Sequence, residues 1–174
     1  LLQKKSQQDF VCVDLIGKKW MCNQEVANLF GNDFNEYCKT VIEKGECEYY
    51  NNFKTKKGIT VEGKLAMELM RKKEPMSNEE IKIFSEQNKI CAHELAMAVA
   101  KKAQVIIGDY FYLFNPRIQE TILKKMDIEL DKVILIVDEA HNLPNRIADM
   151  MSQKLTSVML KRGVMEAEKF RYDG

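Results

Sequence analysis

The sequence has no apolar run near the ~18 residues that a membrane span needs, and no segment with the composition of a signal peptide. It also lacks an excess of either charge, because 27 Lys and Arg residues face 26 Asp and Glu residues. These absences argue against a membrane or secreted protein and against a global basic field for nucleic acid. We therefore expect a cytoplasmic protein, and Leu1 in place of an initiator Met indicates a piece of a longer chain.

The residues that are present suffice for a folded core. The 174 residues are 45% hydrophobic and 30% charged, which is typical of one ordinary domain or two small ones. Short apolar runs at 10–16, 105–107 and 133–137 are predicted strands. A helix is predicted between the last two, because Asn115 can cap it and Pro116 suits its first position. Strand, helix and strand form the crossover unit of an α/β fold with a parallel sheet.

The segment from about Lys18 to Ile90 contains no convincing strand and is predicted to be a helical insertion between two strands. Ser77 and Glu80 have the spacing of a capping box, which starts a helix. Further helical patterns lie at 24–30, 37–44, 62–73 and 92–103, and the chain becomes helical again after Pro144. Short helices with few apolar stripes bury little surface, so a bound metal is expected to stabilise the insertion.

Five cysteines occur in the sequence, and none belongs to a Cys-x-x-Cys pair. Four lie in or at the edge of the insertion, separated by 15, 8 and 43 residues: Cys22, Cys38, Cys47 and Cys91. This spacing is compatible with a tetrahedral zinc ion, with a four-cysteine iron–sulfur cluster, and with ordinary buried thiols. Cys12 has apolar neighbours in the first predicted strand, and we expect it to pack in the core, outside the ligand set.

The apolar run at 133–137 is followed at once by Asp138, Glu139, Ala140 and His141. An apolar strand that ends in two acids places carboxylates at the carboxyl edge of a parallel sheet, where ligands bind in open α/β folds. In phosphoryl transfer, the first acid holds magnesium through water, and a neighbouring acid orients or deprotonates the attacking water. The alternative is a strand followed by a solvated polar loop. No Gly-x-x-x-x-Gly-Lys-[Ser/Thr] loop for the phosphates occurs in this sequence.

The segment Asp138-Glu139-Ala140-His141-Asn142-Leu143 resembles the Walker B box of DEAH-type superfamily 2 helicases, in the form typical of the XPD-like branch. Residues 17–22 resemble the start of that branch's iron–sulfur domain, and residues 91–95 and 103–115 resemble the stretch that leads into Walker B. The resemblance therefore covers nearly the whole chain. Ala92 stands where the family commonly has Pro after the last cysteine, and Glu48 likewise follows Cys47.

The resemblance implies an α/β fold, namely part of a P-loop-type motor domain with a parallel sheet and an all-helical iron–sulfur insertion. Motor domain 1 is expected at 1–17 and 92–144, the insertion at 18–91, and the start of a helical arch domain at 145–174. The implied activity is that of an ATP-dependent DNA helicase that translocates 5′-3′ on single-stranded DNA and unwinds duplex DNA in DNA repair. The insertion is expected near the fork. Because the phosphate loop is expected outside this sequence, the isolated chain is expected to be inactive.

The resemblance also implies cofactors and site residues. A [4Fe–4S] cluster is held by four cysteines: Cys22, Cys38, Cys47 and Cys91. Asp138 binds the magnesium ion of ATP through water, Glu139 activates the attacking water, and His141 couples the phosphate site to the bound DNA.

Candidate DNA contacts follow from the residues themselves. Lys18 and Lys19 precede an aromatic residue, and Tyr110 can stack on a base, so these three are candidates for contacts with single-stranded or forked DNA. His93, near Cys91, is expected to be a structural histidine rather than a group that contacts the ligands. We expect a monomer, in the cytoplasm of an archaeal-like cell or in a eukaryotic nucleus. The alternative function is a DNA-binding module without motor activity, stapled by an iron–sulfur cluster or zinc.

Overall fold

The computed structural model describes residues 10–26, 28–72, 75–152 and 155–170, except the side chains of Arg117 and Phe170. The chain divides into two compact units, Leu1–Leu135 and Ile136–Gly174. Unit 1 contains β1 (Cys12–Leu15), α2 (Gly31–Glu43), α3 (Glu48–Phe53), β2 (Lys54–Thr55), β3 (Gly58–Ile59), α4 (Val61–Lys72), α5 (Asn78–Gln87), α6 (Ala92–Ala100), β4 (Val105–Gly108), α7 (Phe111–Phe114), α8 (Pro116–Met126) and the 3-10 helix η1 (Leu130–Lys132). Unit 2 contains the 3-10 helix η2 (Ala140–Asn142), α9 (Leu143–Met151) and α10 (Ser157–Phe170).

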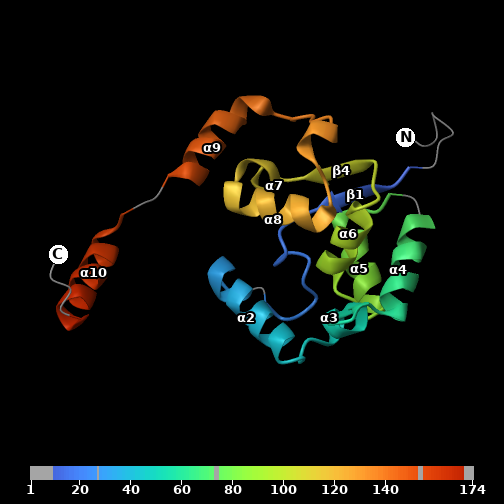
Figure 1. Cartoon of the computed structure of the whole chain (residues 1–174), viewed down its shortest axis with the longest axis horizontal. Helices are drawn as coiled ribbons and strands as arrows, with labels where there is room; N and C mark the ends of the chain where they lie inside the picture. Colours follow the sequence, from blue (N-terminus) through green and yellow to red (C-terminus); the bar gives the residue numbers. More distant parts are fainter. Residues whose placement is uncertain (1–9, 27, 73–74, 153–154, 171–174) are drawn as a thin grey trace. The chain divides into compact units, whose positions relative to one another are not determined.

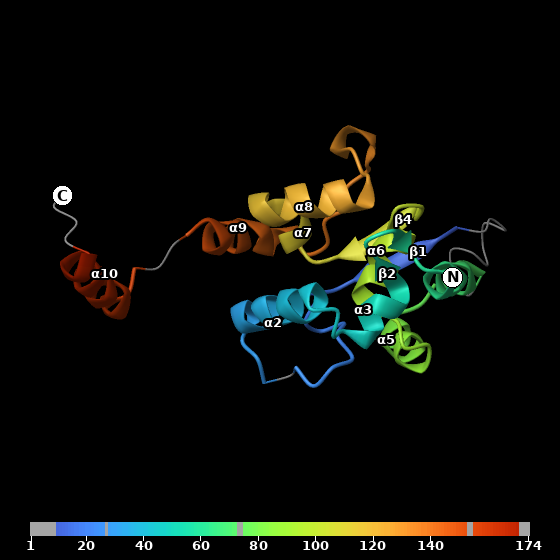
Figure 2. The same cartoon turned by 60° about the horizontal axis from the view of Figure 1, so that its bottom comes forward.

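A parallel pair of strands, β1 and β4, forms the sheet of unit 1. Val13 lies opposite Ile106, and Leu15 lies opposite Gly108. Helix α6 packs against β1, and α4, α5 and α8 pack against α6 (Figure 1). Helix α3 packs against both α4 and α6 (Figure 2). Parallel strands joined and covered by helices define an α/β fold, which confirms the predicted fold class.

Helix α6 is the central helix of unit 1, because every one of its residues is buried. A helix that is apolar on nearly all sides is expected inside a core rather than on a surface. Its two buried polar side chains, His93 and Glu94, lie in its first turn, two and three residues after Cys91. The charged end of an otherwise apolar helix therefore lies next to a predicted metal ligand.

Two helix starts form as their sequence signals predict. At α5, the Ser77 hydroxyl accepts the N–H of Glu80 at 3.3 Å, and the Glu80 carboxylate accepts the N–H of Ser77 at 2.8 Å, which completes the capping box. At α8, the Asn115 side chain accepts the N–H of Ile118 at 3.4 Å, and Pro116 is the first helical residue. These helices are specified by residues close to one another in the chain.

The structure contains most of the other predicted helices, in some cases with different bounds. The patterns at 62–73 and 92–103 are present as α4 and α6, and the helical segment after Pro144 is present as α9 and α10; Lys73 lies outside the described residues. The pattern at 37–44 is the second part of α2, which begins six residues earlier. Helix α3 was not predicted. No helix among the described residues combines the length and the apolar character that a membrane crossing requires.

The predicted helix at 24–30 is wrong for the described residues of that segment, which exclude Ala27. Its backbone instead forms tight turns, with the N–H of Val26 bonded to the carbonyl of Gln24 at 2.8 Å. The reason is tertiary, because Val26 is buried and the Gln24 side chain reaches the sulfur of Cys47. Contacts made at a distance outweigh a weak helical pattern of seven residues.

The predicted all-helical character of the insertion is also wrong, because β2 and β3 form a short antiparallel hairpin. Lys54 lies opposite Ile59, and the hydroxyl of Thr55 accepts the N–H of Lys57 at 3.2 Å inside the turn. Gly58 has a φ of +124°, a value that side-chain-bearing residues rarely adopt. Each strand has two residues, too few for an alternating pattern to predict it.

The predicted strand at 133–137 is absent from the described residues. The segment makes no β-ladder there, and Ile134 and Ile136 are 91% and 87% exposed. Apolar composition indicates that a segment is to be buried, but a strand also needs a neighbouring edge that pairs with its N–H and C=O groups. The three-stranded sheet that the sequence predicts is therefore a two-stranded sheet in the described part of the chain.

Candidate functional site

One cavity of unit 1 is lined by all four predicted cysteine ligands. The space that these residues surround measures about 470 Å³ when the part open to solvent is included. Cys22 follows the turn after β1, Cys38 lies in α2, Cys47 directly precedes α3, and Cys91 directly precedes α6. Segments far apart in the sequence thus each deliver one thiol to the same place. Cys12 lies in β1 and lines a different cavity.

Protein groups already position two of these thiols. The side-chain amide of Gln24 donates to the sulfur of Cys47 at 3.2 Å, and the hydroxyl of Tyr37 donates to the amide oxygen of Gln24 at 2.7 Å. The backbone N–H of Cys91 donates to the carbonyl of Tyr49 at 2.8 Å, which holds the start of α6 against α3. The role of Gln24 leaves no sign in the sequence, because a donor to a cysteine sulfur has no characteristic spacing.

Burial favours the protonated form of two of the thiols, Cys22 and Cys91. Burial raises the pKa of Cys22. The backbone N–H of Gln24 opposes this rise, and the neighbouring Cys38 adds to it. Burial also raises the pKa of Cys91 to about 12, although the backbone N–H of Glu94 opposes the shift. Cys22 and Cys91 are therefore protonated without a metal, and each must release a proton when it becomes a ligand.

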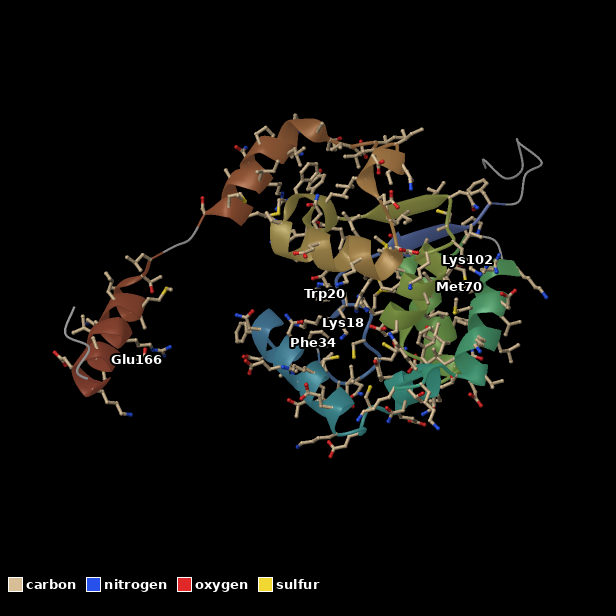
Figure 3. All side chains as sticks on the ribbon, viewed as in Figure 1. Lys18, Trp20, Phe34, Met70, Lys102 and Glu166 are labelled. Atoms are coloured by element: carbon tan, nitrogen blue, oxygen red, sulfur yellow. The ribbon has the colours of Figure 1, made fainter. Side chains whose placement is uncertain are left out.

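Lys18 is the cation of the cavity. Figure 3 shows Lys18 and Phe34 on facing segments, the loop after β1 and helix α2, and both side chains line the cavity. Burial alone lowers the pKa of Lys18, but the adjacent Cys38, with Glu94 and Cys91, outweighs burial and raises it. The ammonium group is thus placed where it can balance the negative charge of thiolate ligands.

A zinc ion and an iron–sulfur cluster require different distances between their cysteine sulfurs. The sulfurs around one tetrahedral zinc ion stand about 3.8 Å apart, because each Zn–S bond is about 2.3 Å long. Among the described residues, no three His, Cys, Asp or Glu side chains are close enough to hold a single metal ion. An iron–sulfur cluster contains several irons and bridging sulfides, so its thiolates stand farther apart. Four thiols that line one cavity are the donor set that such a cluster takes.

His93 and Glu94 form a buried polar pair beside the thiols. His93 lines the cavity, and its Nδ1 lies 3.6 Å from Oε1 of Glu94, too far for a hydrogen bond. Glu94 also faces Nζ of Lys125 at 3.4 Å and Nζ of Lys54 at 4.0 Å. Burial alone raises the pKa of Glu94, but His93 and the two lysines outweigh it and lower the pKa to about 2. Burial lowers the pKa of His93, so its ring is neutral near pH 7. The sequence did not single out Glu94.

The predicted ATP-site residues lie in unit 2, on a turn before α9. The N–H of Glu139 donates to Oδ1 of Asp138 at 2.9 Å, and Nδ1 of His141 lies 3.2 Å from Oε2 of Glu139. Glu139 has a φ of +49°, in the left-handed region that few residues other than glycine adopt. The three residues are therefore a local cluster on a turn. Their predicted placement at the end of a strand is not observed, because the preceding segment is not a strand in the described residues.

The candidate DNA contacts follow the two strands of the sheet. Lys19 comes after β1, donates through Nζ to the carbonyl of Leu29, and lies 5.1 Å from the ring centre of the exposed Trp20. Tyr110 comes after β4, and its carbonyl accepts the N–H of Phe114 at 2.8 Å. Because β1 and β4 are parallel neighbours, both loops leave the sheet at its carboxyl edge, where ligands bind in open α/β folds.

A parallel strand pair, four cysteines on one cavity and an Asp-Glu-Ala-His segment are together the features of an XPD-like superfamily 2 helicase. The chain belongs to the DEAD_2 family, whose model matches residues 1–160. This match confirms the family that the sequence motifs indicate.

Known relatives carry helicase names. "Regulator of telomere elongation helicase 1 homolog" of Caenorhabditis briggsae is 25% identical over 168 residues, which are 95% of this chain and 16% of that protein. "General transcription and DNA repair factor IIH helicase subunit XPD/RAD3" of Saccharomyces cerevisiae is 26% identical over 176 residues, 92% of this chain and 21% of that protein. "Regulator of telomere elongation helicase 1" of Rattus norvegicus is 26% identical over 157 residues, 89% of this chain and 11% of that protein. The chain thus spans between 11% and 21% of the length of these relatives.

Proposed function

We propose that this chain is part of an ATP-dependent DNA helicase that translocates 5′-3′ on single-stranded DNA and unwinds duplex DNA. One observation carries the proposal: in a member of the DEAD_2 family, four cysteines that are distant in sequence line a single cavity. The helicase names of the relatives support the activity, and the name of the yeast relative supports a role in DNA repair. The expected cellular place is the cytoplasm of an archaeal-like cell or a eukaryotic nucleus.

The cavity is proposed to hold a [4Fe–4S] cluster. Its ligands are four thiols: Cys22, Cys38, Cys47 and Cys91. The cluster supplies ligation free energy, which an insertion at 18–91 with a short hairpin and short helices needs for its fold. Lys18 balances the charge of the thiolates, and Gln24 keeps the Cys47 sulfur in place through its amide donor. A rigid insertion is then available to separate the strands at a DNA fork.

The ATP site is proposed to include the turn in unit 2. Asp138 holds the magnesium ion of ATP through water, and Glu139 orients and deprotonates the attacking water. His141, 3.2 Å from Glu139, links this acid to the DNA-bound state. In this proposal residues 1–17 and 92–144 belong to motor domain 1, and residues 145–174 begin the arch domain.

The DNA is proposed to run along the carboxyl edge of the sheet. Lys19 and the exposed Trp20 come from the loop after β1, and Tyr110 comes from the loop after β4. A cation beside an aromatic ring is the combination that contacts the phosphate and the base of a single strand. Lys18 precedes Lys19 in the same loop and is proposed as a further DNA contact, although its side chain also lines the cysteine cavity. The protein is proposed to act as a monomer.

The test uses the intact protein that carries this sequence, purified without oxygen. Iron and sulfide are measured per chain, ATP hydrolysis is measured with and without single-stranded DNA, and unwinding is measured on forks with a single 5′ or 3′ tail. We expect bound iron and sulfide, DNA-stimulated hydrolysis, and unwinding of the 5′-tailed fork. Metal and DNA binding without ATP hydrolysis would instead establish a metal-stapled binding module. Zinc in place of iron would overturn the cluster.

A further inference from the structure

His93 is a buried imidazole beside the four cysteines, and a centre held by those four thiols alone gives it no role as a ligand. It lines the same cavity as the thiols, is 6% exposed, and its Nδ1 has no hydrogen-bond partner. His93 lies two residues after Cys91, in the first turn of α6, so it reaches the cavity from the same element as that thiol.

Glu94 faces one nitrogen of this ring. Its Oε1 lies 3.6 Å from Nδ1 of His93, and the carboxylate is itself held between Lys125 at 3.4 Å and Lys54 at 4.0 Å. Histidines that ligate metals commonly turn one ring N–H to a carboxylate, which leaves the lone pair of the other nitrogen for the metal. Since Nδ1 is the nitrogen beside Glu94, Nε2 is the nitrogen available to the cavity.

We infer that the cavity offers a metal centre five donors rather than four, and that His93 replaces Cys91 as the donor from α6 when that thiol is lost. The inference rests on the proposed function, because it requires an iron–sulfur centre in this cavity. Imidazole takes the place of thiolate in some natural iron–sulfur centres. The exchange replaces one Fe–S bond by one Fe–N bond without oxidation or reduction of the centre. Of the two histidines in the sequence, the other, His141, belongs to unit 2.

Four variants of the intact protein test this inference: Cys91→Ala, His93→Phe, the double variant, and Cys38→Ala. Each is reconstituted with iron and sulfide without oxygen, and bound iron per chain is measured. We expect Cys91→Ala and His93→Phe each to retain most of the wild-type iron, and the double variant to bind iron about tenfold more weakly or worse. Cys38→Ala should lose iron although His93 is present, because α2 contributes no second thiol or imidazole to the cavity.

Electron paramagnetic resonance identifies the replacing atom. The reduced Cys91→Ala protein should show a nitrogen hyperfine coupling that the wild-type protein lacks. Loss of iron from Cys91→Ala, or retained iron without this coupling, would overturn the role of His93 while leaving the four-cysteine centre intact. A wild-type protein that binds neither iron nor sulfide would instead overturn the proposed metal centre itself, and the inference with it.

Discussion

Removing the two lysines that face Glu94 is expected to destabilise unit 1 much more than removing the charge of Glu94 itself. The Glu94 side chain is 9% exposed, whereas those of Lys54 and Lys125 are 43% and 44% exposed. The carboxylate therefore depends on its partners for compensation, while each lysine can be solvated when its partner is gone. The proposed perturbation is Lys54→Met together with Lys125→Met.

The magnitude follows from this asymmetry. A buried charge that loses its partner costs about 3–5 kcal/mol, and the lower end, about 3 kcal/mol, applies because the two lysines are 43% and 44% exposed, so that solvent already screens their charges. Glu94→Gln alone should cost about 1 kcal/mol, the value of an ordinary hydrogen bond, because the amide can still accept from the lysines. Adding Glu94→Gln to the double lysine variant should recover about 2 kcal/mol, since the uncompensated charge is then absent.

Urea unfolding of the metal-loaded proteins, followed by circular dichroism, measures these differences. Lys39→Met is the matched control, because Lys39 pairs with Glu43 at 3.9 Å on an exposed helix surface and should contribute less than about 0.5 kcal/mol. A triple variant no more stable than the double lysine variant would refute the reasoning, because the buried charge of Glu94 would then not be the source of the loss.

Three further outcomes are expected. Cys38→Ala should release the metal and speed amide hydrogen exchange within 18–91 while β1 and β4 keep their protection; uniform loss across unit 1 would contradict this. In the intact protein, Glu139→Gln should bind ATP normally and hydrolyse it about 100-fold more slowly or worse, and near-normal turnover would show that Glu139 is not the base. Gly63→Ala should destabilise unit 1 by about 1–3 kcal/mol in thermal unfolding, because an added Cβ would lie 2.5 Å from the Phe53 carbonyl oxygen. Gly163→Ala, with nothing within 4 Å, should be neutral or stabilising by up to about 1 kcal/mol, and equal effects of the two changes would show that the close contact does not matter.

Elements specified by neighbouring residues were predictable from the sequence. The capping box of Ser77 and Glu80 and the Asn115-Pro116 start of α8 need partners within three residues, so their signals survive any tertiary arrangement. The segment at 24–30 shows the opposite case. Its local pattern is helical, but Gln24 serves the sulfur of Cys47, a residue 23 positions away. A local sequence pattern does not show a contact with a distant residue that outweighs the local helix preference.

The four cysteines that line the cavity could be grouped from the sequence, but the residues that support them could not. Spacing left zinc, a cluster and ordinary thiols open, because separations of up to 43 residues say nothing about distance in space. The fold brings the four thiols to one cavity, and it adds groups that the sequence did not mark, such as Gln24 and Glu94. Groups that support a ligand act through orientation and burial, and neither leaves a motif.

The acids after residue 137 show that a sequence can indicate which residue types are present without indicating where they lie. Val133 and Leu135 are 42% and 51% exposed, much less than Ile134 and Ile136, so the segment alternates between a half-covered face and an open face. Its composition is apolar on both faces, which is typical of a strand that has neighbours on both edges and helices on both sides. The role of Asp138 therefore stays a prediction from its residue type, whereas its position would depend on strand pairing and covering layers that the described part of the chain does not provide for the preceding residues. Glu139→Gln tests the chemistry without requiring that position to be known.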